Sequence, residues 1–370
     1  MATHPLNEQF KTARRNIELG SRRTVAIAAH LEVREVLREA EPLLSRGLQD
    51  VLIGSYVRET GIWPGKDVDV FGRLCDESID SITPSDAYGL FFRVLKREFD
   101  DRVEPQARSI KVNYSTGRQP DRRFIVAAAE QLASSSELTS RDAYPFAVDV
   151  VPAVRFGPRW GIPNRDPSTW VREAAAERWL CTDPEHLTLL TQQLNQRLAI
   201  GGQGAYVPTV KSIRQIRRAH LQDAKPGGLF MELILYEGFT LNEIAGDTWA
   251  DLTASALTYI ADRLLTVTTT PLCDPALNQP YTPVPDTADL VHAATVFRTL
   301  ASKASRALTA DKCPAGALWR EIFGSNTKVN GPVFEPPPGC TASGTVMPVF
   351  GTQVRDPLRG TNEARGFGVE

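Results

Sequence analysis

The chain has 370 residues, of which 42% are hydrophobic and 23% charged, enough for one large domain or two lobes around a shared core. Its formal net charge of −2 excludes a general positive field that would attract nucleic acid, so any recognition of phosphate must depend on local charges. No apolar run approaches the roughly 20 residues that span a bilayer. The polar residues 1–20 also lack the apolar segment of a secretory signal, so we expect a cytoplasmic protein without membrane contact.

The cysteines are scattered along the chain and form neither a CxxC pair nor a cluster with histidine. This usage argues against a disulfide framework and against a structural zinc site. We therefore expect the cysteines to be small buried hydrophobic residues. They are Cys75, Cys181, Cys273, Cys313 and Cys340.

Mixed elements are predicted in the first half of the chain. Apolar periodicity predicts helices over 6–19, 22–40 and 84–98. Short apolar or alternating runs predict strands over 51–53, 67–72 and 109–114. Residues 115–143 combine a basic, turn-rich start with an Ala-rich stretch and are interpreted as partly loop. The β-branched run 146–151 is typical of a central strand, which we expect to end at Pro152.

Helices dominate the second half. Thr182 to Glu185 has the pattern of a capping box with proline in the first turn, which predicts a helix through 198 that stops at Gly201 and Gly202. Val207, Val210, Ile213 and Ile216 recur every three residues and mark a second helix. Further helices are predicted over 229–236, 249–265 and 288–308, and a Pro- and Gly-rich irregular tail from Ser325 onward.

This order of elements predicts an α+β fold with two lobes. We expect a core with a mixed β-sheet and N-terminal helices over 1–160, a helical C-terminal lobe over 161–325, and a tail over 326–370. A cleft between the two lobes is the natural place for a site.

Three aspartates carry the chemical signal. Asp67 and Asp69 are two apart on a predicted strand, so their side chains lie on one face, roughly 6 to 7 Å apart. Asp149 stands among apolar residues on another predicted strand, where a carboxylate is costly to bury without a partner. If the two strands are neighbours, the three carboxylates can hold two Mg²⁺ ions, with Mn²⁺ as a substitute. A solvated strand edge is the alternative interpretation for Asp67 and Asp69.

Gly54 and Ser55 follow directly after a predicted strand. Glycine lets a phosphate approach the backbone, and the serine hydroxyl and the amides at a helix start can donate to it. The pair becomes specific only together with the downstream aspartates. Arg58 and Thr60 in the same segment either orient this loop or cap it.

At these residues the sequence resembles the DNA-polymerase-β-like nucleotidyltransferases. It is most similar to the cGAS/DncV-like branch, the CD-NTases, which are bacterial cyclic-oligonucleotide synthases of CBASS anti-phage systems. The resemblance covers roughly residues 25 to 325 and rests on residues 31–37, 54–62, 149–153, 162–163 and 179–185.

The resemblance implies a role for individual residues. Asp67, Asp69 and Asp149 would be metal ligands and catalytic residues, and Gly54 and Ser55 would hold the triphosphate. Lys211 falls where the family places a lysine that contacts phosphate, and it shares a helix face with Arg214 and Arg218. A solvated basic face is the alternative for the two arginines. The sequence departs from the family at Gly228, where a serine is often found.

The implied function is condensation of nucleoside triphosphates, ATP among them, into a cyclic di- or trinucleotide second messenger for anti-phage signalling. A linear oligonucleotide synthase, or a nucleotidyltransferase that modifies RNA or a protein, is the alternative. The resemblance also implies CBASS accessory or effector proteins as partners. Animal relatives that sense DNA carry a zinc-binding insertion, which this sequence lacks, so direct sensing of double-stranded DNA is not expected.

Overall fold

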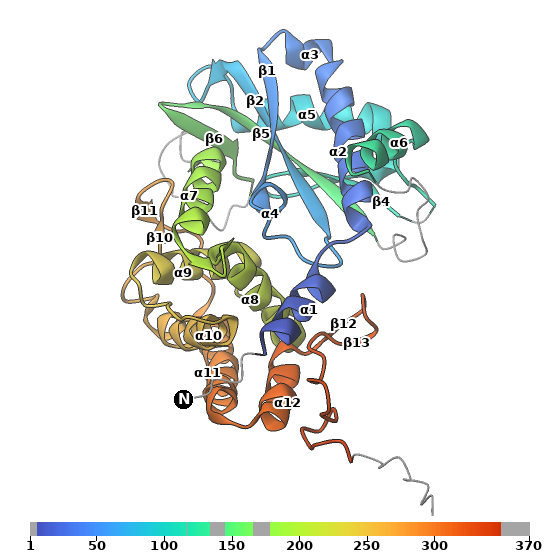
Figure 1. The fold of residues 1–370 in the computed structure, drawn as a ribbon. Helices are drawn as coiled ribbons and strands as arrows, with labels where there is room; N and C mark the ends of the chain where they lie inside the picture. Colours follow the sequence, from blue (N-terminus) through green and yellow to red (C-terminus); the bar gives the residue numbers. More distant parts are fainter. Residues whose placement is uncertain (1–5, 116, 134–144, 166–177, 349–370) are drawn as a thin grey trace, which may run out of the picture.

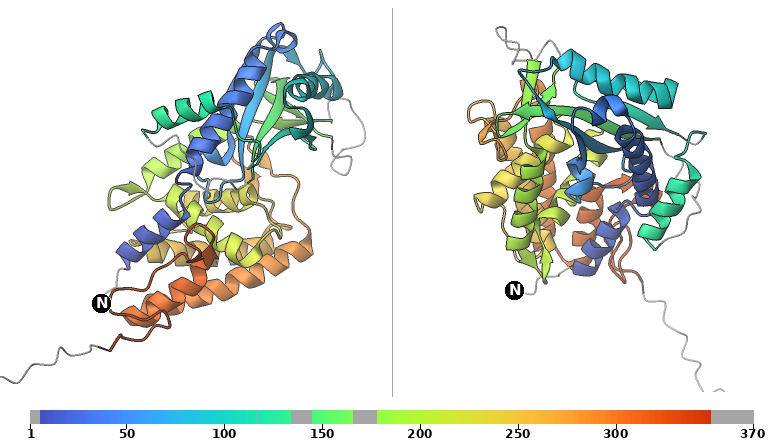
Figure 2. Two further views of the ribbon diagram at one scale, coloured as in Figure 1. Left: turned by 90° about the vertical axis from the view of Figure 1, so that its right-hand side faces the viewer. Right: turned by 90° about the horizontal axis from the view of Figure 1, so that it is seen from above.

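The computed structural model describes residues 6–115, 117–133, 145–165 and 178–348. A lobe of strands and covering helices lies beside a lobe made of helices (Figures 1 and 2). None of the helices in these ranges has the length and apolar character needed to cross a bilayer.

A mixed sheet organises the first lobe. Its main path runs in the order β1-β2-β5-β4-β3, and β6 and β7 extend it from β5. The β2–β5 pair is parallel, whereas the other pairs in this sheet are antiparallel. The strands are β1 (Leu48–Ile53), β2 (Asp67–Ser78), β3 (Val103–Pro105), β4 (Ile110–Tyr114), β5 (Phe146–Phe156), β6 (Arg159–Pro163) and β7 (Trp179–Thr182).

Alternation along the central strands separates two faces. Val68 and Val70 of β2 and Val148 and Val150 of β5 are buried in one cluster beneath two helices. Burial of each such side chain contributes about 1.5–3 kcal/mol. The helices are α2 (Arg22–Arg38) and α5 (Pro84–Phe99), and α6 (Arg122–Gln131) packs against α2. The expected helices and strands of this half are confirmed, and α6 accounts for part of the segment interpreted as loop.

Strand β5 does not end at Pro152, as the sequence predicted, but continues to Phe156. Along β5, the antiparallel pairing with β4 stops at Val150, opposite Ile110, and the pairing with β6 starts only at Val154, opposite Gly161. Pro152 therefore lies where β2 is the only described neighbour, opposite Gly72. Proline has no backbone N–H to donate to a neighbouring strand. On the side away from β2, no described strand pairs with β5 at this position, so no hydrogen bond is lost and the strand tolerates the proline.

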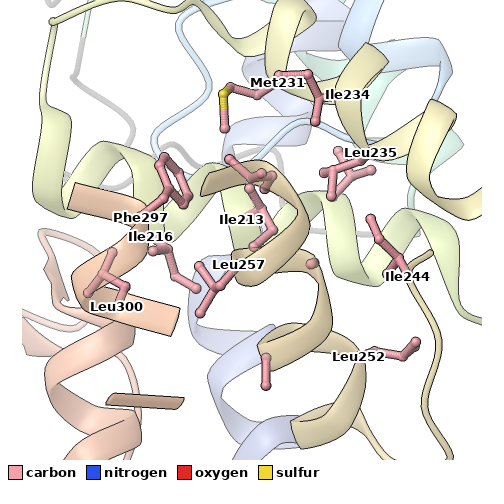
Figure 3. Packing of buried hydrophobic residues seen from close by; sticks show 14 of the residues in the cluster. Ile213, Ile216, Met231, Ile234, Leu235, Ile244, Leu252, Leu257, Phe297 and Leu300 are labelled. Atoms are coloured by element: carbon pink, nitrogen blue, oxygen red, sulfur yellow. The ribbon is translucent and has the colours of Figure 1, made fainter. Parts of the chain in front are cut away.

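The second lobe is built around an apolar core. Ile213 and Ile216 of α8 meet side chains from α9, α10 and α11 (Figure 3). The helices are α1 (Asn7–Ile17), α7 (Pro184–Arg197), α8 (Tyr206–Leu221), α9 (Gly228–Thr240), α10 (Trp249–Thr266), α11 (Thr287–Thr309) and α12 (Lys312–Phe323). The predicted helices of this half are confirmed.

One helix start was assigned to the wrong residue. The N-cap of α7 is Asp183, whose side chain accepts a hydrogen bond from the backbone N–H of His186 at 3.0 Å, and not Thr182. A capping box does occur in this lobe, at Thr248 and Asp251 before α10. The spacing Thr182 to Glu185 fitted the pattern, but Thr182 still belongs to β7.

Both ends of the described chain meet on the helical lobe. The ring of Phe10 lies 5.0, 5.7 and 5.2 Å from the rings of Trp319, Phe323 and Phe334. Phe334 is fully buried, so the first part of the expected irregular tail, although it contains little regular structure, packs against the helical lobe. Residues 349–370 of that tail lie outside the described residues.

Two of the cysteines also contradict expectation. Cys313 at the start of α12 and Cys340 form a disulfide, with their Cα atoms 5.3 Å apart. Scattered spacing hid this pair because the two residues come together only when the C-terminal segment folds back over α12. Cys75, Cys181 and Cys273 are free, and Cys273 is exposed rather than buried.

The remaining elements are short. They are α3 (Glu41–Leu44), α4 (Gly54–Val57) and the 3-10 turn Asp100–Arg102, with three small hairpins. The hairpins are β8 (Ala199–Ile200) with β9 (Gln203–Gly204), β10 (Cys273–Asp274) with β11 (Gln279–Pro280), and β12 (Ser325–Asn326) with β13 (Gly331–Pro332).

Candidate active site

The three aspartates lie on one face of the sheet. Asp69 of β2 and Asp149 of β5 are register partners in the parallel pair, and Asp67 stands two residues before Asp69. Because side chains alternate along a strand, all three carboxylates are opposite the face that carries Val68 and Val70. The sequence prediction that β2 and β5 are neighbours is therefore confirmed.

Gly54 fixes the edge of this site. It directly follows β1, whose last residue Ile53 pairs with Asp69, and it begins α4 with a φ of +76°. A Cβ at this position would lie 1.9 Å from Oδ2 of Asp69. Both the left-handed backbone and the contact with the carboxylate require glycine here.

The segment after Gly54 turns back on itself. The carbonyl oxygen of Ser55 accepts hydrogen bonds from the N–H groups of Thr60, at 2.9 Å, and Gly61, at 3.1 Å. Ser55 lines two pockets, one of which also includes Asp67 and the other Asp69.

The environment of the carboxylates disfavours their charged forms. Burial, together with the neighbouring charges of Asp67 and Asp149, raises the pKa of Asp69 to about 7. Burial and Asp67 raise the pKa of Asp149 to about 6, although Lys111, its register partner on β4, opposes the shift. A bound cation would reverse these shifts.

Whether these residues fit a metal ion can be judged from their donor atoms. Within the described ranges, no three Asp, Glu, His or Cys side chains form a ready-made metal group, so the carboxylates would have to turn toward an ion. Oδ1 of Asp149 is buried and has no hydrogen-bond partner, which leaves this donor available. Hard oxygen donors on adjacent strands suit Mg²⁺ or Mn²⁺. The donor set therefore fits a divalent ion.

Two pockets adjoin the aspartates and share Ser55, Arg214 and Gly228 as walls. The first chamber has a volume of about 460 Å³ and includes Asp67. The second chamber, of about 440 Å³, includes Gly54 and Asp69 and reaches α7 and the β10–β11 hairpin. Both lobes contribute to each chamber, as expected for a site between them.

Lys211 lies apart from both chambers. Its Nζ donates to the two carboxylate oxygens of Glu18 at 2.8 and 3.0 Å. It lines a smaller pocket of about 260 Å³ with Tyr56 and Glu59. Arg214 and Arg218, which the sequence analysis placed on the same helix face, line the first chamber instead.

A buried ion network behind the site was missed by sequence reasoning. Glu232 of α9 is 2% exposed and accepts hydrogen bonds from Arg58 at 2.8 Å, Thr60 at 3.2 Å and Arg214 at 2.8 Å. Burial alone would raise the pKa of Glu232, but the two arginines more than offset this and hold the pKa below its usual value. Arg58 and Thr60 thus tie the loop after Gly54 to the helical lobe. Glu232 is flanked by apolar residues within α9, and this is the sequence signal that could have indicated the network.

The second chamber also contains residues that no sequence pattern indicated. Arg108 before β4 and Asp274 and Tyr281 of the β10–β11 region reach it from distant segments. Their positions depend on how the two lobes are packed together.

Comparison with known proteins gives a consistent result for the fold. No model of a known protein family matches the sequence, and a search of the curated proteins finds no relative. Among solved structures, Escherichia coli MS115-1 CdnC with ATP is similar, with a TM-score of 0.59 and 14% identity, over 90% of this chain and 99% of that chain.

Two further structures are similar. The Bradyrhizobium diazoefficiens CD-NTase CdnG in complex with GTP has a TM-score of 0.61 and 14% identity, over 86% of this chain and 95% of that chain. Vibrio cholerae DncV with 3'-deoxy GTP has a TM-score of 0.55 and 12% identity, over 86% of this chain and 81% of that chain. At this level of identity the likeness establishes the fold, which is the polymerase-β-like α+β fold of these CD-NTases.

Proposed function

We propose that this protein is a nucleotidyltransferase that uses two divalent metal ions to condense nucleoside triphosphates into a cyclic di- or trinucleotide messenger for anti-phage signalling. The observation that carries the proposal is the register pairing of Asp69 with Asp149, beside Asp67 and directly against Gly54. The shared fold, and the similar structures that contain ATP or GTP, support nucleoside triphosphates as substrates.

The reaction joins two nucleotides. A ribose hydroxyl oxygen of one nucleotide forms a bond to the α-phosphorus of another, and the bond from that phosphorus to pyrophosphate breaks. Mg²⁺ at Asp67, Asp69 and Asp149 would supply charge neutralisation and would lower the pKa of the attacking hydroxyl. A last transfer within the linear product closes the ring, and each bond formed releases one pyrophosphate.

The residues of the chain have separate tasks in this scheme. Gly54 and Ser55 hold the triphosphate through the serine hydroxyl and the exposed amides of α4. Asp149, whose Oδ1 has no hydrogen-bond partner, can accept the proton of the attacking hydroxyl. Lys211 serves as a further phosphate contact if it leaves Glu18, which is feasible because side chains in such partly exposed pairs separate at low cost.

Product analysis tests the proposal. The protein is incubated with labelled ATP, GTP, CTP and UTP and with Mg²⁺ or Mn²⁺, then with phosphatase, and the product is identified by mass spectrometry. A phosphatase-resistant cyclic product is the expected result. A phosphatase-sensitive ladder would instead support a linear oligonucleotide synthase, and label on added RNA or protein would support a modifying enzyme.

Two variants test the assignment of the carboxylates. Asp69→Asn and Asp149→Asn should abolish turnover and weaken Mn²⁺ binding, measured by electron paramagnetic resonance. Asp262→Asn is the matched control, because Asp262 is an exposed carboxylate in an ion pair with Arg298 on the helical lobe. An Asp69→Asn protein that keeps wild-type turnover would refute the metal assignment.

An accessory protein is a further part of the proposed function. The Escherichia coli MS115-1 CdnC structure with a HORMA partner has a TM-score of 0.56 to this chain. On this likeness we propose that an accessory protein of the same defence system binds this enzyme. We also propose a cytoplasmic location.

A further inference from the structure

Three arginines from one helix gather in the first chamber. Arg214, Arg217 and Arg218 of α8 line it together with Ser55, Asp67 and Gly228. Their spacing of three and four residues places the three side chains on one face of the helix, toward the chamber that they line. Lys211, one turn earlier, is outside this chamber and is paired with Glu18.

The positive charge of these arginines is poorly compensated. Arg214 shares the carboxylate of Glu232 with Arg58, so one negative charge serves two guanidinium groups. Arg217 donates to the carbonyl oxygens of Pro226 at 2.7 Å and Ala224 at 2.5 Å, which carry no charge.

The other groups around these three arginines add little negative charge. Arg218 donates to the carbonyl oxygen of Trp63. The side chain of Asp223, the other carboxylate at the chamber besides Asp67, is 98% exposed and lies 3.6 Å from Lys66. The chamber therefore holds an excess of positive charge among the residues that the structure describes.

The arginines also behave as a strained group of like charges. Burial, together with the charges of Arg214 and Arg217, lowers the pKa of Arg218 to about 10. Burial and Arg214 lower the pKa of Arg217. An anion between them would relieve this repulsion. In addition, Nε of Arg214 is buried without a hydrogen-bond partner, so one donor is available.

The start of α9 adds further donors to the same chamber. Its N-cap, Gly227, supplies no side chain to the N–H groups of the first turn, and Gly228 begins the helix. A helix start of this kind carries a partial positive charge. A Cβ on Gly228 would lie 3.5 Å from Cζ of Arg214, so the helix start is adjacent to the arginines.

We infer that Arg214, Arg217 and Arg218, with the start of α9, form the main cradle for the polyphosphate of the substrate, in preference to Lys211. This inference rests on the proposed function and identifies the groups that hold the triphosphate. Guanidinium groups bind phosphate oxygens through paired N–H donors, which a single ammonium cannot do. The nucleoside end of the same molecule can then extend past Ser55 into the second chamber.

Binding of inorganic tripolyphosphate tests this inference without turnover, base or ribose. Calorimetric titration in the presence of EDTA should show that the wild-type protein binds it. Arg218→Gln should weaken binding about tenfold, the order expected for a charge-assisted hydrogen bond to phosphate. Arg298→Gln is the matched control, because it lowers the net charge equally at an exposed site of the helical lobe.

A second variant guards against misfolding. Gly228→Asp places a carboxylate beside Arg214, where there is room for a side chain, and an acid is favourable in the first turn of a helix. It should weaken tripolyphosphate binding about tenfold without lowering the unfolding temperature. Lys211→Gln should have a smaller effect than Arg218→Gln.

The outcomes separate this inference from the proposed function. Unchanged tripolyphosphate binding in both Arg218→Gln and Gly228→Asp would overturn the cradle, even if the wild-type protein makes a cyclic product. A larger loss in Lys211→Gln than in Arg218→Gln, or no binding by the wild type, would overturn it as well. Arginine-dependent binding in a protein that makes no oligonucleotide would refute the proposed function alone.

Discussion

Gly54 lies directly against the carboxylate of Asp69, so closely that a Cβ on Gly54 would be 1.9 Å from Oδ2 of Asp69. The glycine thus sets the position of a central carboxylate of the candidate site. This relationship gives a direct test of how accurately that carboxylate must be placed.

We expect Gly54→Ala to lower turnover at least a hundredfold, because the new methyl group must displace Asp69 or the start of α4, and small misplacements at reacting groups have effects of about this size. Steady-state product formation measures the change. Gly201→Ala is the matched control, since Gly201 also has a positive φ, of +57°, but faces open space. Equal turnover in the two variants would contradict this prediction, because the contact of Gly54 with Asp69 would then have no effect beyond that of a positive φ.

The raised pKa of Asp69 predicts how stability depends on pH. Its pKa in the folded protein is about 7, against a usual value of 3.8, so the folded state favours the protonated carboxyl. This contribution to stability is present below pH 4 and is lost as the pH rises through 7. In EDTA, the free energy of unfolding of the wild type should therefore fall between pH 5 and pH 8 relative to Asp69→Asn. If the free energy of unfolding, measured by urea denaturation, changes with pH in the same way in both proteins, the prediction is contradicted. Added Mn²⁺ should remove the difference in pH dependence between the two proteins.

Glu232→Gln should destabilise the protein by about 3–5 kcal/mol, because it leaves Arg58 and Arg214 without the charge that compensates them in a buried place. Urea denaturation at pH 7 measures the change. Asp262→Asn makes the same chemical change in an exposed ion pair and should cost less than about 1 kcal/mol. A similar small loss in both variants would mean that the network contributes no more than a surface pair.

Loss of the Cys313–Cys340 disulfide should lower the free energy of unfolding by about 2–4 kcal/mol, since the bond closes a loop across a sequence separation of 27 residues. Cys313→Ser and Cys340→Ser should show equal losses, and reductant should then change neither variant. Cys273→Ser, at an exposed free cysteine, is the control and should stay sensitive to reductant. A wild-type protein that is insensitive to reductant would show that the bond does not form.

Much of the fold could be predicted from local sequence patterns, because helix and strand periods depend on nearby residues. The alternation over 67–72 and the β-branched run from Phe146 both indicated strands, and the aspartates on them indicated a shared site. The path of β5 through Pro152 could not be predicted, since it depends on where the partner strands β4 and β6 end.

Contacts between segments far apart in the chain were the other limit. Cys313 with Cys340 and Glu232 with Arg58 become visible only once the segments are packed. The ion pair of Lys211 could not be predicted either, although its helix was predicted correctly. Its partner Glu18 precedes α2 and lies 193 residues away, so no local pattern could place the two together.

The position of Phe10 has a consequence for synthesis of the chain. Its ring is enclosed by Trp319, Phe323 and Phe334, which are synthesised long after it. Helix α1 therefore stays without these aromatic partners until α12 and the segment that follows it have been made. A chain truncated before residue 319 would leave the buried side of this helix, which carries Phe10, Ala13 and Ile17, without these partners, and nascent-chain chaperones can recognise such an exposed apolar side.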